Sequence, residues 1–337
     1  MNYQWFIGID IAKLSLDITI LYGSEQKSYL KIENSDTAIK KFLHDLKVKE
    51  KLSLQTCLFC MEHTGIYNNA ILKIMEEQKL SLCLESSLQI KQSLGLQRGK
   101  NDQIDSYRIA MYAYKNREFL TLWQPERSVL KQLRRLNTLR ERLVSAKLQL
   151  QVSVKEEKKF VCKQTAKQID ACCKRSINAL QEDISKTQKA IQTIIESDEL
   201  LTRLFQIIES IPGVGKVTAT EIVLNTGEFK RIHNARKYAC YAGVAPFEHS
   251  SGTSVRGRTR VSKKANMRAK SLLHMSALTA SRYCKDLKQY YDRKVEEGKS
   301  KMNVLNAIKN KIIHRIFSCV QHNRLYQIDY NQPLVES

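Results

Sequence analysis

The sequence contains no long apolar run. No stretch approaches the roughly 20 apolar residues of a membrane-spanning helix, and no apolar segment near the start is followed by a cleavage site. This excludes an integral membrane protein and an exported one. We therefore expect a cytoplasmic protein with no membrane partner.

Glycine is absent between Gly99 and Gly213, and Pro125 is the only proline in that interval before Pro212. Both residues disfavour helix interiors, so their absence predicts a long helical stretch. Apolar residues recur within it at alternating spacings of three and four, in two sets: Leu136, Leu139, Leu143, Ala146 and Leu150, then Ile177, Leu180, Ile184, Thr187, Ile191 and Ile194. This favours two helices paired as an antiparallel hairpin or across a dimer, with a turn or tip at 155–159. An ordinary helical domain would show the same spacing.

The nine cysteines are scattered and odd in number, which favours reduced thiols over a disulfide framework. Cys57, Cys60 and His63 have a spacing that zinc sites use. However, no second cysteine pair completes four ligands, and the segment around Cys57 and Cys60 is apolar like a buried strand. We therefore favour core cysteines over a zinc site.

Acidic residues are in the minority, because 34 Asp and Glu face 56 Lys and Arg and the formal net charge is +22. From Ser250 to Lys285 there are nine Lys or Arg and no acid. A run of one sign needs counter-charge, and a nucleic-acid backbone supplies it; a solvated basic face is the alternative. The candidate phosphate contacts in this run are Arg256, Arg258, Arg260, Lys263, Lys264 and Arg268.

The first 120 residues have the pattern of an α/β domain. Apolar strands are predicted at 5–9, 14–21 and 54–61, and helices at 37–46 and 68–78. The strand at 14–21 would be the hairpin partner of the first one. We therefore expect a mixed sheet covered by helices.

Four carboxylates occupy positions where such a sheet places its ligands. Asp10 and Glu62 each close an apolar strand, and Asp102 and Asp105 lie three residues apart at the start of a helix. Oxygen ligands of this kind suit Mg²⁺ or Mn²⁺, and a pair of such ions catalyses phosphodiester chemistry. Alternatively, Asp102 would be a helix cap, Glu62 a turn residue and Asp10 a strand terminator.

A second motif begins at Ile211-Pro-Gly-Val-Gly-Lys216 and has the form of a helix-hairpin-helix loop. Gly213 and Gly215 permit a tight turn, and the amides of the following helix, from Lys216, can bind a DNA phosphate. A glycine-linked helix pair with no ligand is the alternative.

Three segments resemble the signatures of the DEDD transposases of bacterial insertion sequences, the IS-one-ten family: Phe6-Ile-Gly-Ile-Asp10-Ile-Ala-Lys13, Met61-Glu62-His-Thr-Gly-Ile-Tyr67 and Lys100-Asn-Asp102-Gln-Ile-Asp105. The resemblance implies a RuvC-like, RNase H-type domain in which the four carboxylates hold Mg²⁺. Ser106 departs from the pattern, since the family often has alanine there, and we expect it to be tolerated.

The C-terminal part is similar to the transposase domain of the same family, through Tyr241-Ala-Gly-Val-Ala-Pro246, Ser251-Gly252 and Arg258-Thr-Arg-Val-Ser-Lys263. The resemblance assigns a nucleophilic role to Ser251. Chemistry alone would also allow Ser250 or Ser254, because each lies near the arginines whose charge would stabilise an attacked phosphorus.

We therefore expect three domains: a RuvC-like domain at 1–122, a helical coiled-coil arm at 123–207, and a mainly helical, basic transposase domain with a helix-hairpin-helix at 208–330. The expected function is a transposase that cuts and rejoins donor and target DNA as a homo-oligomer. The resemblance implies a structured non-coding guide RNA as a further partner. The alternatives are a metal-dependent Holliday-junction or structure-specific nuclease, and a non-catalytic nucleic-acid scaffold.

Overall fold

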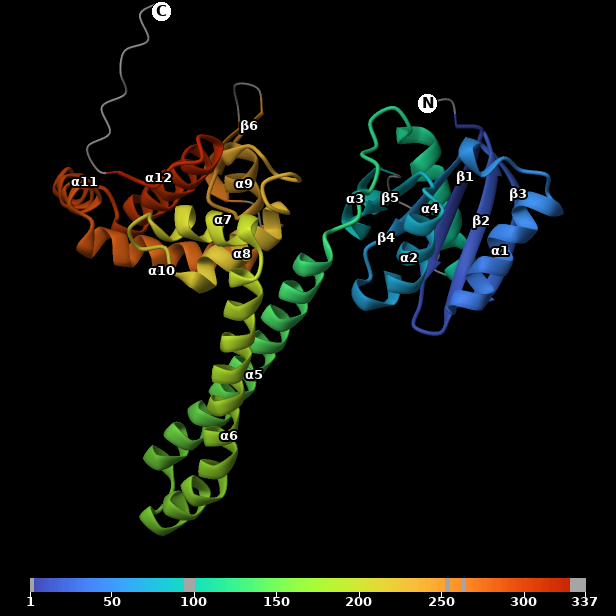
Figure 1. The fold of residues 1–337 in the computed structure, drawn as a ribbon. Coiled ribbons are helices and arrows are strands. Elements are labelled where there is room, and N and C mark those ends of the chain that lie inside the picture. Colours follow the sequence, from blue (N-terminus) through green and yellow to red (C-terminus); the bar gives the residue numbers. More distant parts are fainter. Residues whose placement is uncertain (1–2, 94–100, 252–254, 262–264, 328–337) are drawn as a thin grey trace, which may run out of the picture. The chain divides into compact units, whose positions relative to one another are not determined.

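The computed structural model describes residues 3–93, 101–251, 255–261 and 265–327, with the backbone alone for 246–251 and 255–261. The chain forms two compact units, Met1–Pro125 and Glu126–Ser337 (Figure 1). In the described residues, no helix is both long and apolar enough to cross a membrane.

The first unit is built on a five-stranded sheet. Its strands, in chain order, are β1 (Trp5–Ile11), β2 (Ser15–Tyr22), β3 (Glu25–Glu33), β4 (Cys57–Glu62) and β5 (Leu82–Glu85), and they lie side by side in the order β3-β2-β1-β4-β5. The pairs β1/β2 and β2/β3 are antiparallel, whereas β1/β4 and β4/β5 are parallel. The predicted mixed sheet is confirmed, although the sequence did not reveal β3 or β5.

Helices cover both faces of this sheet because its strands alternate apolar side chains between two cores. Ile7 and Ile9 of β1 share one core with α1 (Asp36–Val48) and α2 (Asn69–Glu77). Phe6 shares the other core with α4 (Asp102–Asn116), and α3 (Ser87–Ser93) contributes Ile90 to it. Two short 3₁₀ helices, Leu54–Thr56 and Gly65–Asn68, flank β4.

Gly8 allows α4 to lie directly on the sheet. A Cβ atom at this position would lie 2.2 Å from the carbonyl oxygen of Ser106 and 2.3 Å from the amide nitrogen of Ala110. Both are backbone atoms of α4, so no side-chain rotation could relieve the clash. Gly8 therefore sets the distance between β1 and the helix that begins with Asp102.

The second unit is mainly helical. It contains α5 (Ser128–Phe160), α6 (Lys163–Glu196), α7 (Glu199–Glu209), α8 (Lys216–Thr226), α9 (Ala235–Tyr241), α10 (Met267–Tyr283), α11 (Lys285–Glu296) and α12 (Lys301–Gln321), with one antiparallel strand pair, β6 (Pro246–Ser251) and β7 (Val255–Val261). A single apolar core joins α7 to α12 with the start of α5 and the end of α6. This strand pair was not expected in a region predicted to be helical with glycine turns.

The long helices α5 and α6, here called the arm, lie side by side along their lengths (Figure 1). The segment 155–159, predicted as a turn or tip, is helical at the end of α5, which continues to Phe160 directly before the chain reverses at Val161 and Cys162. Lys and Glu favour helix, and Lys158 and Lys159 interact favourably with the carbonyl end of α5. Of the predicted apolar stripes, Ile184, Thr187 and Ile191 are buried, but Leu139 is 45% exposed.

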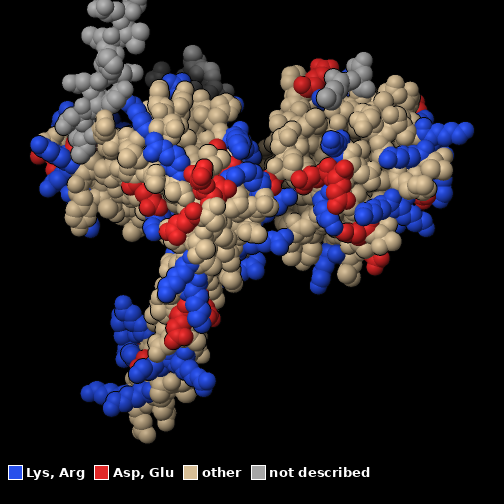
Figure 2. All heavy atoms as spheres, viewed as in Figure 1, with Lys and Arg blue, Asp and Glu red and all other residues tan. Residues whose placement is uncertain are grey.

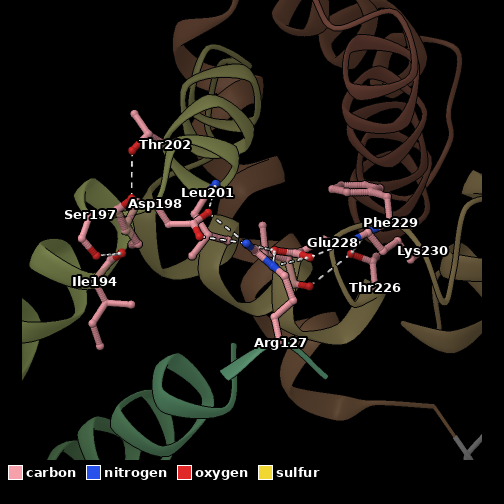
Figure 3. Close-up of polar contacts among 12 residues, drawn as sticks. Arg127, Ile194, Ser197, Asp198, Leu201, Thr202, Thr226, Glu228, Phe229 and Lys230 are labelled. Atoms are coloured by element: carbon pink, nitrogen blue, oxygen red, sulfur yellow. Dashed lines mark hydrogen bonds and ion pairs between the residues drawn. The ribbon is translucent and has the colours of Figure 1, made fainter. Parts of the chain in front are cut away.

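An ion cluster fixes the base of the arm (Figure 3). Arg127, directly before α5, binds both carboxylate oxygens of Asp198 at 2.8 and 2.9 Å and also binds Glu228. Asp198 caps α7 by accepting a hydrogen bond from the Leu201 amide at 2.9 Å. Glu228 is buried and receives a second cation, Lys230, at 3.1 Å. One guanidinium therefore joins the starts of α5 and α7 to the turn after α8.

Candidate active site

The strand register brings four carboxylates into one row across the sheet. Asp10 of β1 pairs with Asp17 of β2, and Glu62 of β4 pairs with Glu85 of β5. Ile9 pairs with Met61, so Asp10 and Glu62 are neighbours in the next register position. We call Asp17, Asp10, Glu62 and Glu85 the carboxylate row.

The row lies on the face that α4 covers. Asp10 follows Phe6 and Gly8 at intervals of two, and these residues contact α4. Glu62 follows Leu58 and Cys60 of the same core in the same way. Alternation along two apolar strands therefore turns both predicted carboxylates toward the helix that carries the other two.

The first turn of α4 supplies Asp102 and Asp105. The helix cap is Asn101, whose side-chain oxygen accepts a hydrogen bond from the Ile104 amide at 2.7 Å. The cap interpretation of Asp102 is therefore wrong, and its side chain is 64% exposed. Likewise Glu62 is the last residue of β4 and not a turn residue.

Two cations bind the acids of this region. The Lys31 ammonium of β3 lies 3.2 Å from Asp17 and 3.4 Å from Asp102. The Arg108 guanidinium lies 2.9 Å from Asp105, one turn earlier on α4. Asp17 is almost completely buried and also accepts a hydrogen bond from the Tyr29 hydroxyl at 2.5 Å.

The acids of this region also disfavour one another's charged form. Burial raises the pKa of Asp10, and the neighbouring carboxylates Asp105 and Asp102 raise it further. Burial also raises the pKa of Glu62, with Asp10 as the next largest cause. Acids that raise one another's pKa form a site of negative potential, and a divalent cation would relieve it.

The side chains as they stand do not enclose a metal. In the part of the chain that the structure describes, no group of three or more His, Cys, Asp or Glu residues has a metal-binding arrangement. The donor chemistry nevertheless fits a hard cation, because the candidate ligands are all carboxylates. Asp102 and Asp105 would have to exchange Lys31 and Arg108 for the metal.

The loop after Glu62 is built around a buried amide. Asn68 donates a hydrogen bond to the Glu62 carbonyl at 2.9 Å and accepts one from the Thr64 amide at 2.7 Å. Because Asn68 is 1% exposed, these bonds are shielded from water. The segment 62–68 is thereby held against the end of β4, which fixes the backbone that carries Glu62.

Asp17 and Glu85 were missed at the level of sequence. Glu85 closes the apolar segment Leu82-Cys-Leu-Glu85, the signal that identified Glu62, but that short strand was not recognised. Asp17 interrupts an apolar strand whose hairpin register with β1 places it opposite Asp10. Burial raises the pKa of Glu85 as well.

Ser106 fits its place in the fold. It is fully buried on the side of α4 that faces the sheet, and its hydroxyl lies 2.8 Å from that of Thr19 on β2 while donating to the Gln103 carbonyl at 3.0 Å. A buried hydroxyl with two partners costs little. Ser106 therefore adds a bond between helix and sheet next to Asp105.

Cys57 and Cys60 do not face one ion. Cys57 belongs to the core beneath α1 and α2, and Cys60 to the core beneath α4. Burial raises the pKa of Cys57 to about 12 and that of Cys60 well above its usual value. Both are core thiols on opposite faces of β4.

The predicted nucleophile lies on the β6–β7 hairpin. Ser251 is the last residue of β6 and pairs with Val255, and Ser250 pairs with Arg256. Arg256, Arg258 and Arg260 occupy alternate positions of β7. The side chains of 246–261 lie outside the described residues, as do Ser254, Lys263 and Lys264 altogether.

Of the six candidate phosphate contacts in the basic run, Arg268 is the one whose side chain the structure describes, and acids already bind it. Its Nε atom lies 2.7 Å from Glu141 of α5 and 3.0 Å from the buried Glu221 of α8. Burial raises the pKa of Glu141. The guanidinium thus joins the arm to α8 and α10.

The predicted glycine loop connects α7 and α8. Gly213 has a φ of +90°, and a Cβ there would lie 2.4 Å from the Ser276 carbonyl of α10. Gly215 is the N-cap residue of α8, and no side-chain hydrogen bond caps the helix there. A Cβ atom added at Gly215 would have no other atom within 4 Å. Lys216 donates a hydrogen bond to Gln192 of the arm at 2.9 Å.

Two family models match the chain. A DEDD transposase model of IS110 matches residues 7–156, and the model described as Transposase IS116/IS110/IS902 family matches residues 205–292. The first includes all four predicted carboxylates, and the second includes Ser251 and the β6–β7 hairpin. Together the two matches span most of the chain.

Individual relatives agree with these models. The pilin gene-inverting protein of Moraxella lacunata is 23% identical over 95% of this chain and 96% of its own length. The transposase for insertion sequence element IS1111A of Coxiella burnetii is 26% identical over 46% of this chain and 44% of its own. RuvC of T. thermophilus in complex with a Holliday junction substrate matches 36% of this chain and all of its own at 12% identity and a TM-score of 0.29.

Proposed function

The chain belongs to the IS110 family of DEDD transposases, and from this premise we propose that it cuts and rejoins DNA at a carboxylate site and a serine. The observation that supports this most is the position of Asp10 and Glu62 in one row, on the face covered by the helix that begins with Asp102 and Asp105. Acids that raise one another's pKa are suited to hold divalent metal.

In the proposed mechanism Asp10, Glu62, Asp102 and Asp105 hold Mg²⁺, or Mn²⁺ in its place. The bound ion would stabilise negative charge on the scissile phosphate. Asp17 would keep Lys31 beside the site, because that ammonium also binds Asp17 when Asp102 turns to the metal. Asn68 would hold the Glu62 backbone in place throughout the reaction.

Ser251 is the proposed nucleophile. Its hydroxyl loses a proton, Oγ forms a bond to phosphorus, and the bond from phosphorus to one deoxyribose oxygen breaks, so that this oxygen leaves and takes up a proton. The covalent phosphoserine conserves the bond energy. Attack by a free DNA hydroxyl then releases serine and joins a new strand. Arg256, Arg258 and Arg260 are the proposed phosphate contacts around it.

Donor and target DNA are the proposed substrates, and we extend the proposal to a structured guide RNA and a homo-oligomer. The net charge of +22 supports either nucleic acid. We also propose that the α7–α8 pair acts as a helix-hairpin-helix and that the arm pairs as a coiled coil between protomers. The uncapped start of α8, at Gly215, is consistent with a phosphate at its amides.

Covalent trapping tests the nucleophile. A stalled reaction of the full chain with labelled DNA should leave protein joined to a DNA end, visible on a denaturing gel. Mass spectrometry should locate the link at Ser251, and Ser251→Ala should bind DNA without forming an adduct. An adduct at Ser250 or Ser254 would move the nucleophile. Efficient cleavage without any adduct would instead favour the metal-dependent nuclease that uses water.

A separate variant tests the metal site and the scaffold alternative. Asp10→Asn should abolish cleavage while DNA affinity stays within about twofold, because the phosphate contacts lie elsewhere. Cleavage that continues in excess chelator would contradict a metal site. If the wild-type chain binds DNA but cleaves none with either Mg²⁺ or Mn²⁺, the non-catalytic scaffold is the better description.

A further inference from the structure

The β6–β7 hairpin, which carries Ser251, depends on other parts of the fold for its position. In the residues that the structure describes, its two strands pair with each other and with no further strand. A two-stranded hairpin is at best marginally stable by itself in water. The contacts where the chain enters and leaves the hairpin therefore decide where Ser251 lies relative to the helices of the second unit.

Tyr241 and Asn266 close the hairpin where the chain enters and leaves it, and we call this pair the neck. Tyr241 ends α9, and Asn266 directly precedes α10. The Asn266 amide donates a hydrogen bond to the Tyr241 carbonyl at 2.8 Å, and its side-chain Nδ2 donates to the Tyr241 hydroxyl at 2.9 Å. Asn266 also caps α10, since its side-chain oxygen accepts a hydrogen bond from the Ala269 amide at 2.9 Å. One residue pair thus ties both ends of the hairpin to the helical core.

The Tyr241 hydroxyl has a second partner on α8. It donates to the side-chain oxygen of Asn225 at 3.3 Å, and the Asn225 side chain donates to Glu221 at 2.9 Å. Asn225 and Glu221 are 6% and 7% exposed, so these hydrogen bonds are shielded from water. Because the hydroxyl donates one hydrogen bond and accepts another, two partners determine its position and orientation.

The same chain of hydrogen bonds continues to the arm. Glu221 accepts a hydrogen bond from Nε of Arg268 at 3.0 Å, and that Nε atom also lies 2.7 Å from Glu141 of α5. Asn137, one turn before Glu141, donates to Glu141 at 2.9 Å and to Glu221 at 3.4 Å. A buried polar network whose members have partners is rigid and favours one arrangement of the helices that carry it. The neck is therefore connected to α5 through α8.

We propose that Tyr241 is a positioning residue for Ser251. Its hydroxyl holds the neck of the hairpin against α8, and the chain through Glu221 makes the position of the hairpin depend on the arm. Misplacing a reacting group by about 1 Å lowers a rate by about 100-fold, so a small shift at the neck is enough to slow the attack. The role of Ser251 rests on the proposed function, whereas the fixing of the hairpin by Tyr241 does not.

Hydrogen exchange of the full-length protein tests whether Tyr241 fixes the hairpin. Tyr241→Phe removes the hydroxyl and keeps the ring. The control, Thr218→Val, removes a buried hydroxyl that lies 3.4 Å from that of Ser276, between α8 and α10 of the same core. We expect similar decreases of about 3 °C in the Tm of both variants. Relative to the amides of α12, those of β6 and β7 should exchange at least about tenfold faster in Tyr241→Phe and within about twofold of wild type in Thr218→Val.

Covalent trapping measures the effect on Ser251. At saturating DNA, Tyr241→Phe should form the adduct at least about tenfold more slowly than wild type, while its affinity for DNA stays within about twofold. Thr218→Val should match wild type in both. Asn266→Ser should act like Tyr241→Phe, because serine still caps α10 but its shorter side chain does not reach the Tyr241 hydroxyl. This second variant keeps the test informative if Tyr241→Phe does not fold.

A variant in the arm tests the connection to α5. Glu141→Gln should speed the exchange of the hairpin amides and slow adduct formation, each by at least about threefold. Combined with Tyr241→Phe it should add little, because both changes interrupt one chain of hydrogen bonds. Glu182→Gln, at an exposed position of α6, removes the same charge and should have neither effect. Fully additive effects of Glu141→Gln and Tyr241→Phe would contradict the connection.

Equal exchange of the hairpin amides in Tyr241→Phe and Thr218→Val would overturn the proposal. So would faster exchange with an unchanged rate of adduct formation, because Tyr241 would then fix the hairpin without positioning Ser251. The exchange experiment requires no cleavage. A wild-type protein that forms no adduct at Ser251 would remove the nucleophile and its positioning residue together, whereas failure of the exchange experiment alone would remove the role of Tyr241 and leave the nucleophile standing.

Discussion

Asp10 lies in the middle of the carboxylate row, with Asp17 on one side and Glu62 on the other. Its raised pKa means that the folded protein binds the proton of this carboxyl more tightly than the unfolded chain does. Ionisation of Asp10 therefore opposes folding. The protonated Asp10 carboxyl therefore stabilises the fold. This contribution is complete below the ordinary pKa of 3.8 and is lost as the pH rises through the raised pKa. Near neutral pH the metal-free site is destabilised by its own charge.

Asp10→Asn should accordingly stabilise the metal-free protein while abolishing cleavage. We expect the free energy of unfolding at pH 7 to rise by about 1 kcal/mol, and the difference from wild type to vanish near pH 3. Denaturant unfolding at the two pH values, without divalent ions, measures it. Glu77→Gln, at an exposed position of α2, removes the same charge and should change neither quantity.

Mg²⁺ should reverse the order of stability. Binding to the folded state raises wild-type stability in proportion to the logarithm of ion concentration, and the Asn variant lacks a ligand. Thermal unfolding at increasing Mg²⁺ concentration measures this effect. If Mg²⁺ raised the Tm of the two proteins equally, the result would contradict a metal site at Asp10. An Asp10→Asn protein less stable than wild type in the absence of metal would contradict the electrostatic argument.

At the scale of elements, the sheet and α4 are joined through Gly8 and through the Thr19–Ser106 hydroxyl contact. Gly8→Ala should push α4 away from β1 and so separate Asp102 and Asp105 from Asp10. We expect a loss of about 3 kcal/mol in stability, typical of overpacking against backbone, and a cleavage rate reduced at least about 100-fold. Single-turnover cleavage and denaturant unfolding measure the two effects.

Thr19→Val provides the comparison, since it removes the hydroxyl contact without adding an atom against the α4 backbone. It should cost about 1 kcal/mol and leave the cleavage rate within about threefold. If Gly8→Ala cleaves as fast as Thr19→Val at equal fraction folded, the spacing of α4 from β1 does not control the site.

The base of the arm depends on pH in the opposite direction from Asp10. The hydrogen bonds from Arg127 lower the pKa of Asp198, so this pair stabilises the fold above the ordinary value of 3.8 and the contribution is lost as the pH falls through the lowered value. Arg127→Met leaves Glu228 buried with Lys230 alone, and should cost about 3 kcal/mol at pH 7. Unfolding of this variant should show a smaller loss of stability between pH 5 and pH 2 than wild type. If the variant lost as much stability as wild type between pH 5 and pH 2, the ion cluster around Arg127 would not hold the base of the arm.

The helices and strands that were predicted correctly are those with a long periodic pattern of apolar residues. The paired strands β1 and β2, the buried β4 and the arm helices have long apolar patterns, and Asp10 and Glu62 follow directly from where two such strands end. β3 was missed because its exposed, charged sequence lacks an apolar face, and β5 because four residues carry little pattern. The β6–β7 hairpin was missed because its arginines and serines do not alternate with apolar residues.

Within the site, the partners of the charged side chains depend on tertiary contacts, which the spacing of residues in the sequence does not show. No local sequence pattern shows that Lys31 lies against Asp17 and Asp102, because Lys31 belongs to β3, a strand that was not predicted. Arg268 was expected to bind nucleic acid from the charge of its segment, yet Glu141 and Glu221 lie 47 or more residues away in sequence and bind it.

At the scale of the whole molecule, nearly all of the excess of Lys and Arg lies in the second unit, which has 40 Lys and Arg against 20 Asp and Glu, whereas the first has 16 against 14. Blue side chains gather along the arm as well as on the two compact parts of the face shown in Figure 2. Several of the acids are already bound within the fold, as Asp198 and Glu228 are by Arg127 and Glu221 is by Arg268. The net positive potential is therefore available to a polyanion, and binding should be sensitive to salt throughout.

Replacing Arg256, Arg258 and Arg260 together by Gln should weaken that salt dependence. If each arginine releases one counterion from duplex DNA, the slope of log affinity against log salt should become shallower by about 2.7, and affinity at low salt should fall by about three orders of magnitude. Lys167→Gln, Lys174→Gln and Arg175→Gln on α6 together remove the same charge from the arm, and the slope should change by less than about 1. Titrations of one labelled duplex at four salt concentrations measure both variants. An equal change in the two would mean that DNA responds to overall charge, and an unchanged slope in the first would mean that the β7 arginines form a solvated face.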